Sequence, residues 1–183
     1  MRPAATPERG PGERVDGILM MAMLMALYWP GLAPGWRMHG DAAELALVAA
    51  VDGTAHPPGY PLWTALAHAF ATWVPVGRAP WRVTLFTALT MAGAATALRG
   101  VLRRVGAGRA LAFGLASGFA LLPGPIRYAS MPEVYGLHLL FIGLAWWLAL
   151  GGSTREAALA GVVAGVACGH HPTAAFLVPA LWV

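Results

Sequence analysis

Two carboxylates and a histidine lie close together in a polar segment between two apolar stretches of the chain. Asp41 and Glu44 are three residues apart, and His56 follows in the same segment, residues 40–63. On a helix, a spacing of three residues puts both carboxylates on roughly one face. A carboxylate or a histidine can take a proton from a reacting hydroxyl group. Because ionisable groups beside a bilayer are costly to place, this segment is the first candidate for a working site.

Structural roles compete with chemistry at several polar residues. Asp41 can cap the helix that follows it, with Glu44 completing a capping box. Glu133 follows a proline and can favour the positive end of a helix. Arg127 can meet lipid headgroups. Structural roles are also expected for three further residues. Asp52 should be a solvated residue at a helix end, and His68 and His138 should pack within apolar runs.

Metal binding is a weaker reading of the same residues. The adjacent His170 and His171 would point about 100° apart on a helix, so they rarely share one ion. A site for a divalent metal built from Asp41, Glu133 and His171 stays open as an alternative to a site without any cofactor. The single cysteine, Cys168, lies in an apolar run and excludes both an internal disulfide and a cysteine-based metal site.

The composition indicates an integral membrane protein. Of the 183 residues, 58% are hydrophobic and 11% are charged, whereas a soluble domain has about 25% charged residues. All 12 basic residues are arginine, and many sit at the ends of apolar runs. Membrane proteins mark their cytoplasmic side in this way, so we expect the bilayer as a partner and no nucleic acid, despite the net charge of +4.

The fold class that follows is all-α, a polytopic transmembrane helical bundle. We expect residues 1–16 to form a disordered cytoplasmic tail and residues 17–183 to form the bundle, incomplete at its C-terminal end because the last apolar run stops midway. An external loop, residues 34–78, should hold a surface helix at 41–52 and a juxtamembrane helix at 62–74, separated by a proline-rich corner. Later runs should cross the membrane in turn, at residues 83–98, 110–122, 134–150 and 157–169.

This topology gathers polar residues from separate segments on the external face. Residues 124–133 are expected outside, and the arginine-rich residues 99–109 and the segment 151–156 are expected inside. The residues that should converge outside are Asp41, Glu44, His56, Arg82, Arg127, Glu133, His170 and His171.

Four blocks of the chain together resemble a known family. They are Asp41-x-x-Glu44 with Ala55-His56-Pro57-Pro58-Gly59-Tyr60-Pro61-Leu62, then Trp81-Arg82-Val83-x-Leu85-Phe86, Glu133-Val134-Tyr135-x-Leu137-His138 and Gly169-x-His171-x-Thr173. This pattern is similar to a family long classed as of unknown function, related to protein O-mannosyltransferases and grouped with the GT-C glycosyltransferases. The chain departs from the family pattern at Ala42-Ala43, Thr84 and His170, where the family more often has Ser-Gly, Asn and Asn.

The resemblance implies transfer of a sugar from a polyprenyl-phosphate donor to a hydroxyl acceptor, which can be a protein serine or threonine. It implies an inverting displacement with Asp41 as general base and Glu44 as a second catalytic residue. Bound donor and phosphate would contact His56, Arg82, Arg127, Glu133, Tyr135 and His171, with arginine suited to gripping phosphate. The expected location is the plasma membrane of a bacterium, with the active site facing outside.

A non-catalytic alternative remains open at this stage. The chain could bind or transport a lipid-linked anion without turnover, or be a truncated remnant of an enzyme. A transporter built from inverted repeats is the weaker alternative, because no matching halves are visible in the sequence.

Overall fold

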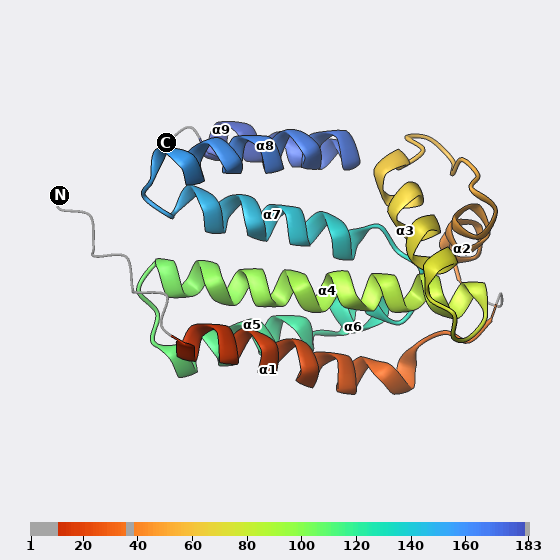
Figure 1. The fold of residues 1–183 in the computed structure, drawn as a ribbon, viewed down its shortest axis with the longest axis horizontal. Helices are drawn as coiled ribbons and strands as arrows, with labels where there is room; N and C mark the ends of the chain where they lie inside the picture. Colours follow the sequence, from red (N-terminus) through yellow and green to blue (C-terminus); the bar gives the residue numbers. More distant parts are fainter. Residues whose placement is uncertain (1–10, 36–38, 182–183) are drawn as a thin grey trace.

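The structure, a computed structural model, describes residues 11–35 and 39–181, and all regular elements in these ranges are helical. The longer helices lie side by side along the long axis of the molecule, and shorter helices lie across one end (Figure 1). The long bundle consists of α1 (Pro11–Tyr28), α4 (Ala79–Arg104), α5 (Arg109–Ala120), α7 (Tyr135–Ala149) and α8 (Thr154–His170). The remaining elements are η1 (Trp29–Gly31), α2 (Ala42–Val51), α3 (Pro61–Trp73), α6 (Pro123–Ala129), η2 (Pro172–Phe176) and α9 (Leu177–Leu181).

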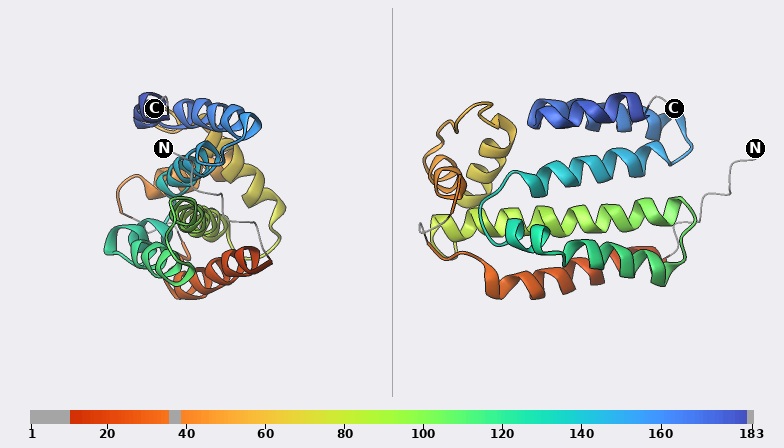
Figure 2. Two further views of the ribbon diagram at one scale, coloured as in Figure 1. Left: turned by 90° about the vertical axis from the view of Figure 1, so that its left-hand side faces the viewer. Right: turned by 180° about the vertical axis from the view of Figure 1, so that it is seen from behind.

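Helix α4 is the centre of the bundle and contacts α1, α2, α3, α5, α6 and α7 (Figure 2). Its faces bury small residues, so neighbouring helices approach closely. One core joins α1, α4 and α5 around Met20, Leu24 and Met91. A second core joins α2, α3, α4 and α7 around the fully buried Trp63, and a third joins α7, α8 and α9.

Close packing of α7 on α4 depends on Gly136, in the first turn of α7. A Cβ atom at this position would lie 2.6 Å from Thr90 Oγ1 and 2.9 Å from the carbonyl oxygen of Thr87. Only glycine fits here, because the close-packed interior of a protein leaves no space for an added carbon atom. This contact fixes the N-terminal end of α7, and therefore the loop that precedes it.

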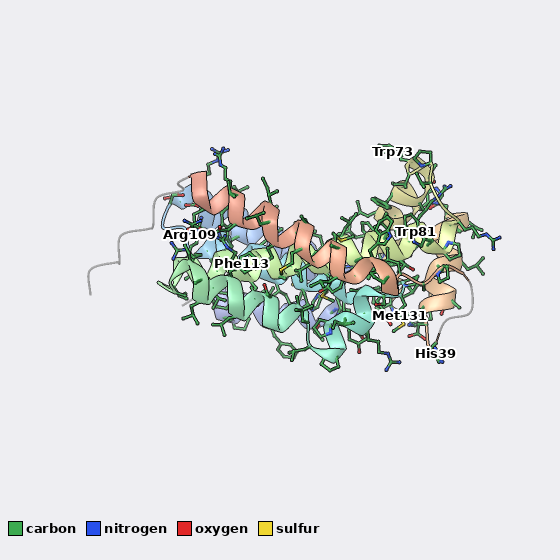
Figure 3. The ribbon with its side chains drawn as sticks, turned by 90° about the horizontal axis from the view of Figure 1, so that it is seen from below. His39, Trp73, Trp81, Arg109, Phe113 and Met131 are labelled. Carbon is green, nitrogen blue, oxygen red and sulfur yellow. The ribbon has the colours of Figure 1, made fainter. Side chains whose placement is uncertain are left out.

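The two ends of the bundle differ in structure: short helices cover one end, and ion pairs join the helices at the other. Helices α2 and α3 cover the end at which α4 and α7 begin, whereas Arg109 lies at the opposite end, far from Trp81 and Met131 (Figure 3). Arg99, near the other end of α4, has a side chain only 4% exposed, and it donates to Glu13 and Asp16 at 2.7 Å each. Ion pairs therefore tie the start of α1 to the end of α4.

These ion pairs correct the expected cytoplasmic tail. Residues 11–16 are the first turns of α1 rather than a disordered segment, because Glu13 and Asp16 find arginine partners far along the chain. The rest of the tail, residues 1–10, lies outside the described residues. Much of the segment 124–133, expected on the external side, belongs to the short helix α6, which bends by 68° from α5.

The helical fold class is confirmed, but the membrane spans are only partly supported. Of the helices described, α4 is the one long and apolar enough to cross a bilayer by itself, and the bent pair of α5 and α6 would count as a second. Helices α7 and α8 have 15 and 17 residues, at or below the shortest length of a spanning helix. The expected polytopic bundle therefore remains a proposal.

Candidate functional site

The first element of the candidate site is the N-terminal end of α2, which presents Asp41. The backbone of Asp41 starts the helix, and its carbonyl oxygen accepts the N–H of Leu45 at 2.8 Å. Its side chain makes no capping hydrogen bond within the described chain, and it is 65% exposed. The capping box considered above is thus not formed, so the carboxylate of Asp41 is accessible to a ligand.

Glu44 lies one helical turn after Asp41 and holds His56 with both of its oxygens. The backbone N–H of His56 donates to Oε1 at 2.7 Å, and the ring Nδ1 donates to Oε2 at 2.9 Å. The hydrogen bond that His56 donates to the Glu44 side chain raises the pKa of His56, and the same contact lowers the pKa of Glu44. The other ring nitrogen, Nε2, lies 3.7 Å from Asp41 Oδ2. Glu44 therefore orients an imidazole toward Asp41.

The proline-rich corner that follows turns the chain back over this group. Gly59 has a φ of 87° and Tyr60 a φ of 44°, both in the left-handed region, which disfavours tyrosine. This conformation places the Tyr60 ring 5.8 Å from the ring of His56 and stacks it on His171 at 5.9 Å. Pro61 then opens α3 in its first turn, as the sequence predicts. Strain of this kind is concentrated at functional sites in proteins.

Glu133 approaches the same group from the loop between α6 and α7. Its N–H donates to Thr87 Oγ1 of α4 at 3.3 Å. Burial and, after it, the negative charge of Asp41 raise the pKa of Glu133 to about 6. The positive charge of Arg127 acts in the opposite direction on the same carboxyl group. Asp41, Arg127 and Glu133 are therefore electrostatic neighbours, although they come from distant parts of the sequence.

His171 forms the far wall, where α8 ends. Its ring lies 6.0 Å from Tyr135 and 4.6 Å from His138, and its Nδ1 lies 2.8 Å from Thr173 Oγ1. The same hydroxyl group lies 3.0 Å from Nε2 of His138. Sequence reasoning assigned no role to Tyr60 or Thr173, and His138 was read as a packing residue. The signal for them was their place inside the family-like blocks.

Arg82 is not brought to this group. Its guanidinium donates to the carbonyl oxygens of Ala71 at 2.8 Å, Val76 at 3.0 Å and Gly77 at 2.9 Å. These contacts hold the C-terminal end of α3 and the turn after it. The role of Arg82 in binding phosphate stays a prediction, whereas Arg127, exposed at the end of α6, acts electrostatically on Glu133.

The residues able to hold a metal also differ from those expected. Within the described residues, the only group of three ligands with atoms inside 4.8 Å of one another is Asp41, Glu44 and His56. The expected set of Asp41, Glu133 and His171 does not come together in this way. Each oxygen of Glu44 accepts one hydrogen bond from His56, which keeps the ring Nε2 of His56 directed toward Asp41. The arrangement fits proton transfer with His56 as an intact partner of Glu44.

Comparison with known proteins places these residues in a family. The family model of the protein O-mannosyl-transferase TMEM260 N-terminal domain matches residues 41–183, starting at Asp41. Protein O-mannosyl-transferase TMEM260 of Mus musculus is 36% identical over 124 residues, which are 68% of this chain and 17% of that protein. The corresponding Dictyostelium discoideum protein is 40% identical over 52 residues, 27% of this chain and 6% of that protein.

The chain thus corresponds to a small part of the length of these relatives. No solved structure matches it. The match of the family model covers more than half of the chain and includes every residue of the candidate site, from Asp41 to His171. The chain therefore belongs to the protein O-mannosyl-transferase TMEM260 family, through its N-terminal domain.

Proposed function

We propose that this chain carries the catalytic end of a GT-C type membrane glycosyltransferase, which moves mannose from a polyprenyl-phosphate donor to a protein hydroxyl. The observation that carries the proposal is the exposed Asp41 carboxylate beside the oriented Glu44–His56 pair, within the segment that the family model matches. The names of the relatives support the sugar and the protein acceptor.

The proposed reaction is a single displacement. The acceptor oxygen bonds to the anomeric carbon, the bond from that carbon to the phosphate oxygen breaks, and the hydroxyl proton goes to Asp41 as general base. Inversion follows from attack opposite the leaving group. The polyprenyl phosphate leaves as an anion, and anions at such a site need nearby positive charge or hydrogen-bond donors. Protonated His56 and Arg127 supply the positive charge in this proposal, and no metal is required.

The other site residues position the substrates. Glu44 acts through His56, since both of its oxygens are engaged there. Glu133, Tyr135 and His171 bind the donor in this proposal, and the rings of Tyr135 and His171 lie 6.0 Å apart. The Tyr60 ring, stacked on His171, closes that wall.

Membrane placement is supported by the outer surface of the bundle. Large apolar side chains face outward along three of its helices, with Ile18 of α1 68% exposed, Leu111 of α5 57% exposed and Val162 of α8 62% exposed. Apolar surface spread in this way is unusual for a soluble monomer and suits lipid. We propose a multi-pass protein of a bacterial plasma membrane, with the arginine-rich end in the cytoplasm and the site outside.

The decisive experiment is transfer by the full-length protein with polyprenyl-phosphate mannose and a serine- or threonine-containing peptide. Asp41→Asn should lower the rate by about 10²-fold or more, because a positioned general base contributes that much. Asp52→Asn is the matched control, since Asp52 is an exposed residue at the other end of α2 and its left-handed conformation suits asparagine. Equal rates in both variants would remove Asp41 from the mechanism.

The non-catalytic alternative makes a different prediction in the same assay. A binding or transport protein would retain the donor without releasing free polyprenyl phosphate, whereas the transferase releases one for each sugar moved. Topology is tested separately, in a variant in which alanine replaces Cys168. The exposed Thr54 and Thr154 each become cysteine, and an impermeant thiol reagent should label only the first from outside the cell. Labelling of both would refute the proposed topology.

A further inference from the structure

Residues of α1, α4 and α7 line a groove toward the end of the bundle away from Asp41. These three helices lie along the long axis of the molecule (Figure 1). The volume of the groove is about 1030 Å³. The walls are apolar over most of the length and consist of Ile18, Met21 and Met25 of α1, Gly93 and Ala97 of α4, and Leu144 of α7. Ion-paired arginines close the far end of the groove.

The arginine end carries more positive than negative charge. Four arginines line the groove, Arg14, Arg99, Arg103 and Arg104, against two glutamates, Glu13 and Glu156. Arg103 donates to Glu13 at 2.8 Å, and Arg104 donates through Nη2 to Glu156 at 2.7 Å. Asp16, which accepts from Arg99 just outside the lining, adds a third carboxylate, so the four arginines still outnumber the carboxylates beside them.

The buried guanidinium group of Arg104 is a second observation that points to a bound anion. Its side chain is only 6% exposed, and its guanidinium lies 4.2 Å from the ring centroid of Trp147. The Nη1 group has no hydrogen-bond acceptor within the part of the chain that the structure describes. A buried donor without an acceptor costs free energy, more so when it is charged. An oxygen of a bound anion at this wall would satisfy it.

The chemistry of the groove defines its occupant. A small soluble anion would leave the apolar walls empty, and an uncharged lipid would leave the arginine excess without counter-charge. An apolar chain joined to a phosphate satisfies both. We propose that the groove binds an anionic phospholipid of the surrounding bilayer, with an acyl chain between α1 and α7 and its phosphate against Arg103 and Arg104. This inference rests on the membrane placement proposed above.

The bound phospholipid is distinct from the sugar donor. Thr87, which holds the loop of Glu133, and Arg104 are 17 residues apart on α4, or roughly 25 Å along the helix axis. The phosphate of this lipid therefore lies in the other leaflet from the candidate site. With the arginine end in the cytoplasm, that leaflet is the one rich in anionic lipids.

The test measures dissociation constants of phosphatidylglycerol and phosphatidylcholine for the full-length protein, by native mass spectrometry in detergent without any donor present. Phosphatidylglycerol should bind about tenfold more tightly, because both lipids carry a phosphate but only phosphatidylglycerol has a net negative charge to offset the arginine excess. Arg104→Gln should remove this preference. Arg155→Gln should keep it, because Arg155 is exposed on α8 and lies outside the groove lining. Equal affinity for the two lipids in the unaltered protein would overturn the proposal.

A second pair of variants guards against unfolding of Arg104→Gln. Ala22 is exposed and lines the groove, whereas Ala26 is exposed one turn later on α1 and does not. Ala22→Trp should fill the groove and weaken phosphatidylglycerol binding about tenfold, and Ala26→Trp should leave it unchanged. Unaltered binding by Ala22→Trp would refute the groove as the site.

The lipid result and the transfer result can fail separately. Asp41→Asn should bind phosphatidylglycerol as the unaltered protein does, because its substitution lies at the other end of the bundle. A protein that prefers phosphatidylglycerol but transfers no sugar would retain the groove and remove the proposed function. A protein that transfers sugar but binds both lipids equally would retain the proposed function and remove the groove as a site for anionic phospholipid.

Discussion

Substituting Gly136 tests how the bundle positions the candidate site. In Gly136→Ala the new Cβ would lie 2.6 Å from Thr90 Oγ1, 2.9 Å from the Thr87 carbonyl oxygen and 3.0 Å from the Met91 nitrogen. Two of these atoms belong to the backbone of α4 and cannot rotate away. The start of α7 must therefore move outward by roughly half an ångström, because close-packed interiors leave no space for an added methyl group.

The expected cost has two parts. Overpacking should lower the free energy of unfolding by about 1–3 kcal/mol. Displacing the start of α7 also displaces Glu133, which lies just before it, relative to the Thr87 hydroxyl of α4 that accepts its N–H. Misplacement of a substrate-binding group by about 1 Å can cost about 10²-fold in rate, so a shift of half that size should cost roughly tenfold.

The assay pairs thermal unfolding in detergent with sugar transfer, and Gly161→Ala is the control. Gly161 lies in α8 with nothing within 4 Å of an added Cβ, so alanine there should stabilise by about 0.5–1 kcal/mol. The double variant Gly136→Ala/Thr90→Ala should recover part of the loss, because one of the three close atoms is gone. If Gly136→Ala unfolds at or above the temperature of Gly161→Ala, the packing argument is wrong.

Three further predictions concern charge. Glu44→Gln should move the pKa of His56 down toward its usual value, so the imidazolium signal of His56 in NMR titration should be lost at lower pH than in the unaltered protein. Glu133→Gln should raise the unfolding temperature at pH 8 but not at pH 5, because the raised pKa of about 6 makes the ionised carboxyl unfavourable above that pH. Arg82→Ala should lower the unfolding temperature without changing KM for the donor, and Arg82→Lys should not rescue it, since the guanidinium serves the end of α3 through several donors.

The signs of the first two predictions follow from proton linkage. The stability that the Glu44–His56 pair contributes is present between the ordinary pKa values of the two groups, 4.5 and 6.5. It is lost as pH rises through the raised pKa of His56 and as pH falls through the lowered pKa of Glu44. Glu133 acts in the opposite direction, because its folded-state pKa lies above 4.5 and stability rises as the carboxyl takes up its proton. A flat stability profile from pH 5 to 8 in the unaltered protein would contradict this assignment for Glu133.

Sequence periodicity and punctuation predicted the helices well wherever local signals suffice. Pro61 opens α3 as predicted, because proline fits the first turn of a helix. The preceding helix, α2, ends at Val51, where Asp52 adopts a left-handed conformation, and so it stops before the chain reaches the proline-rich corner. The start of α1 was missed because Glu13 and Asp16 look like a solvated tail until Arg99 is known to lie beside them. Partners more than 80 residues away leave no trace in local composition.

The site was predicted in part for the same reason. Asp41, Glu44 and His56 are close in sequence, and their spacing on one helix and its following loop brings them together. The contacts of Arg82 with carbonyl oxygens of Ala71 and Gly77 could not be predicted, because nothing in the local sequence indicates that its donors turn back toward the end of α3. The stacking of Tyr60 on His171 depends on a left-handed backbone at Tyr60, which residue type alone disfavours.

The wall formed by Tyr60 and His171 has a consequence for the order of assembly during synthesis. The contacts among Asp41, Glu44 and His56 span few residues, so they can form soon after the ribosome has released that segment. The stack on Tyr60 has a far higher contact order and must wait until the chain has been made through His171. A nascent chain would thus hold its acid and histidine in place, yet leave them uncovered, until α8 docks. Any variant that slows the docking of α8 should lengthen that open interval without altering the acid–histidine contacts themselves.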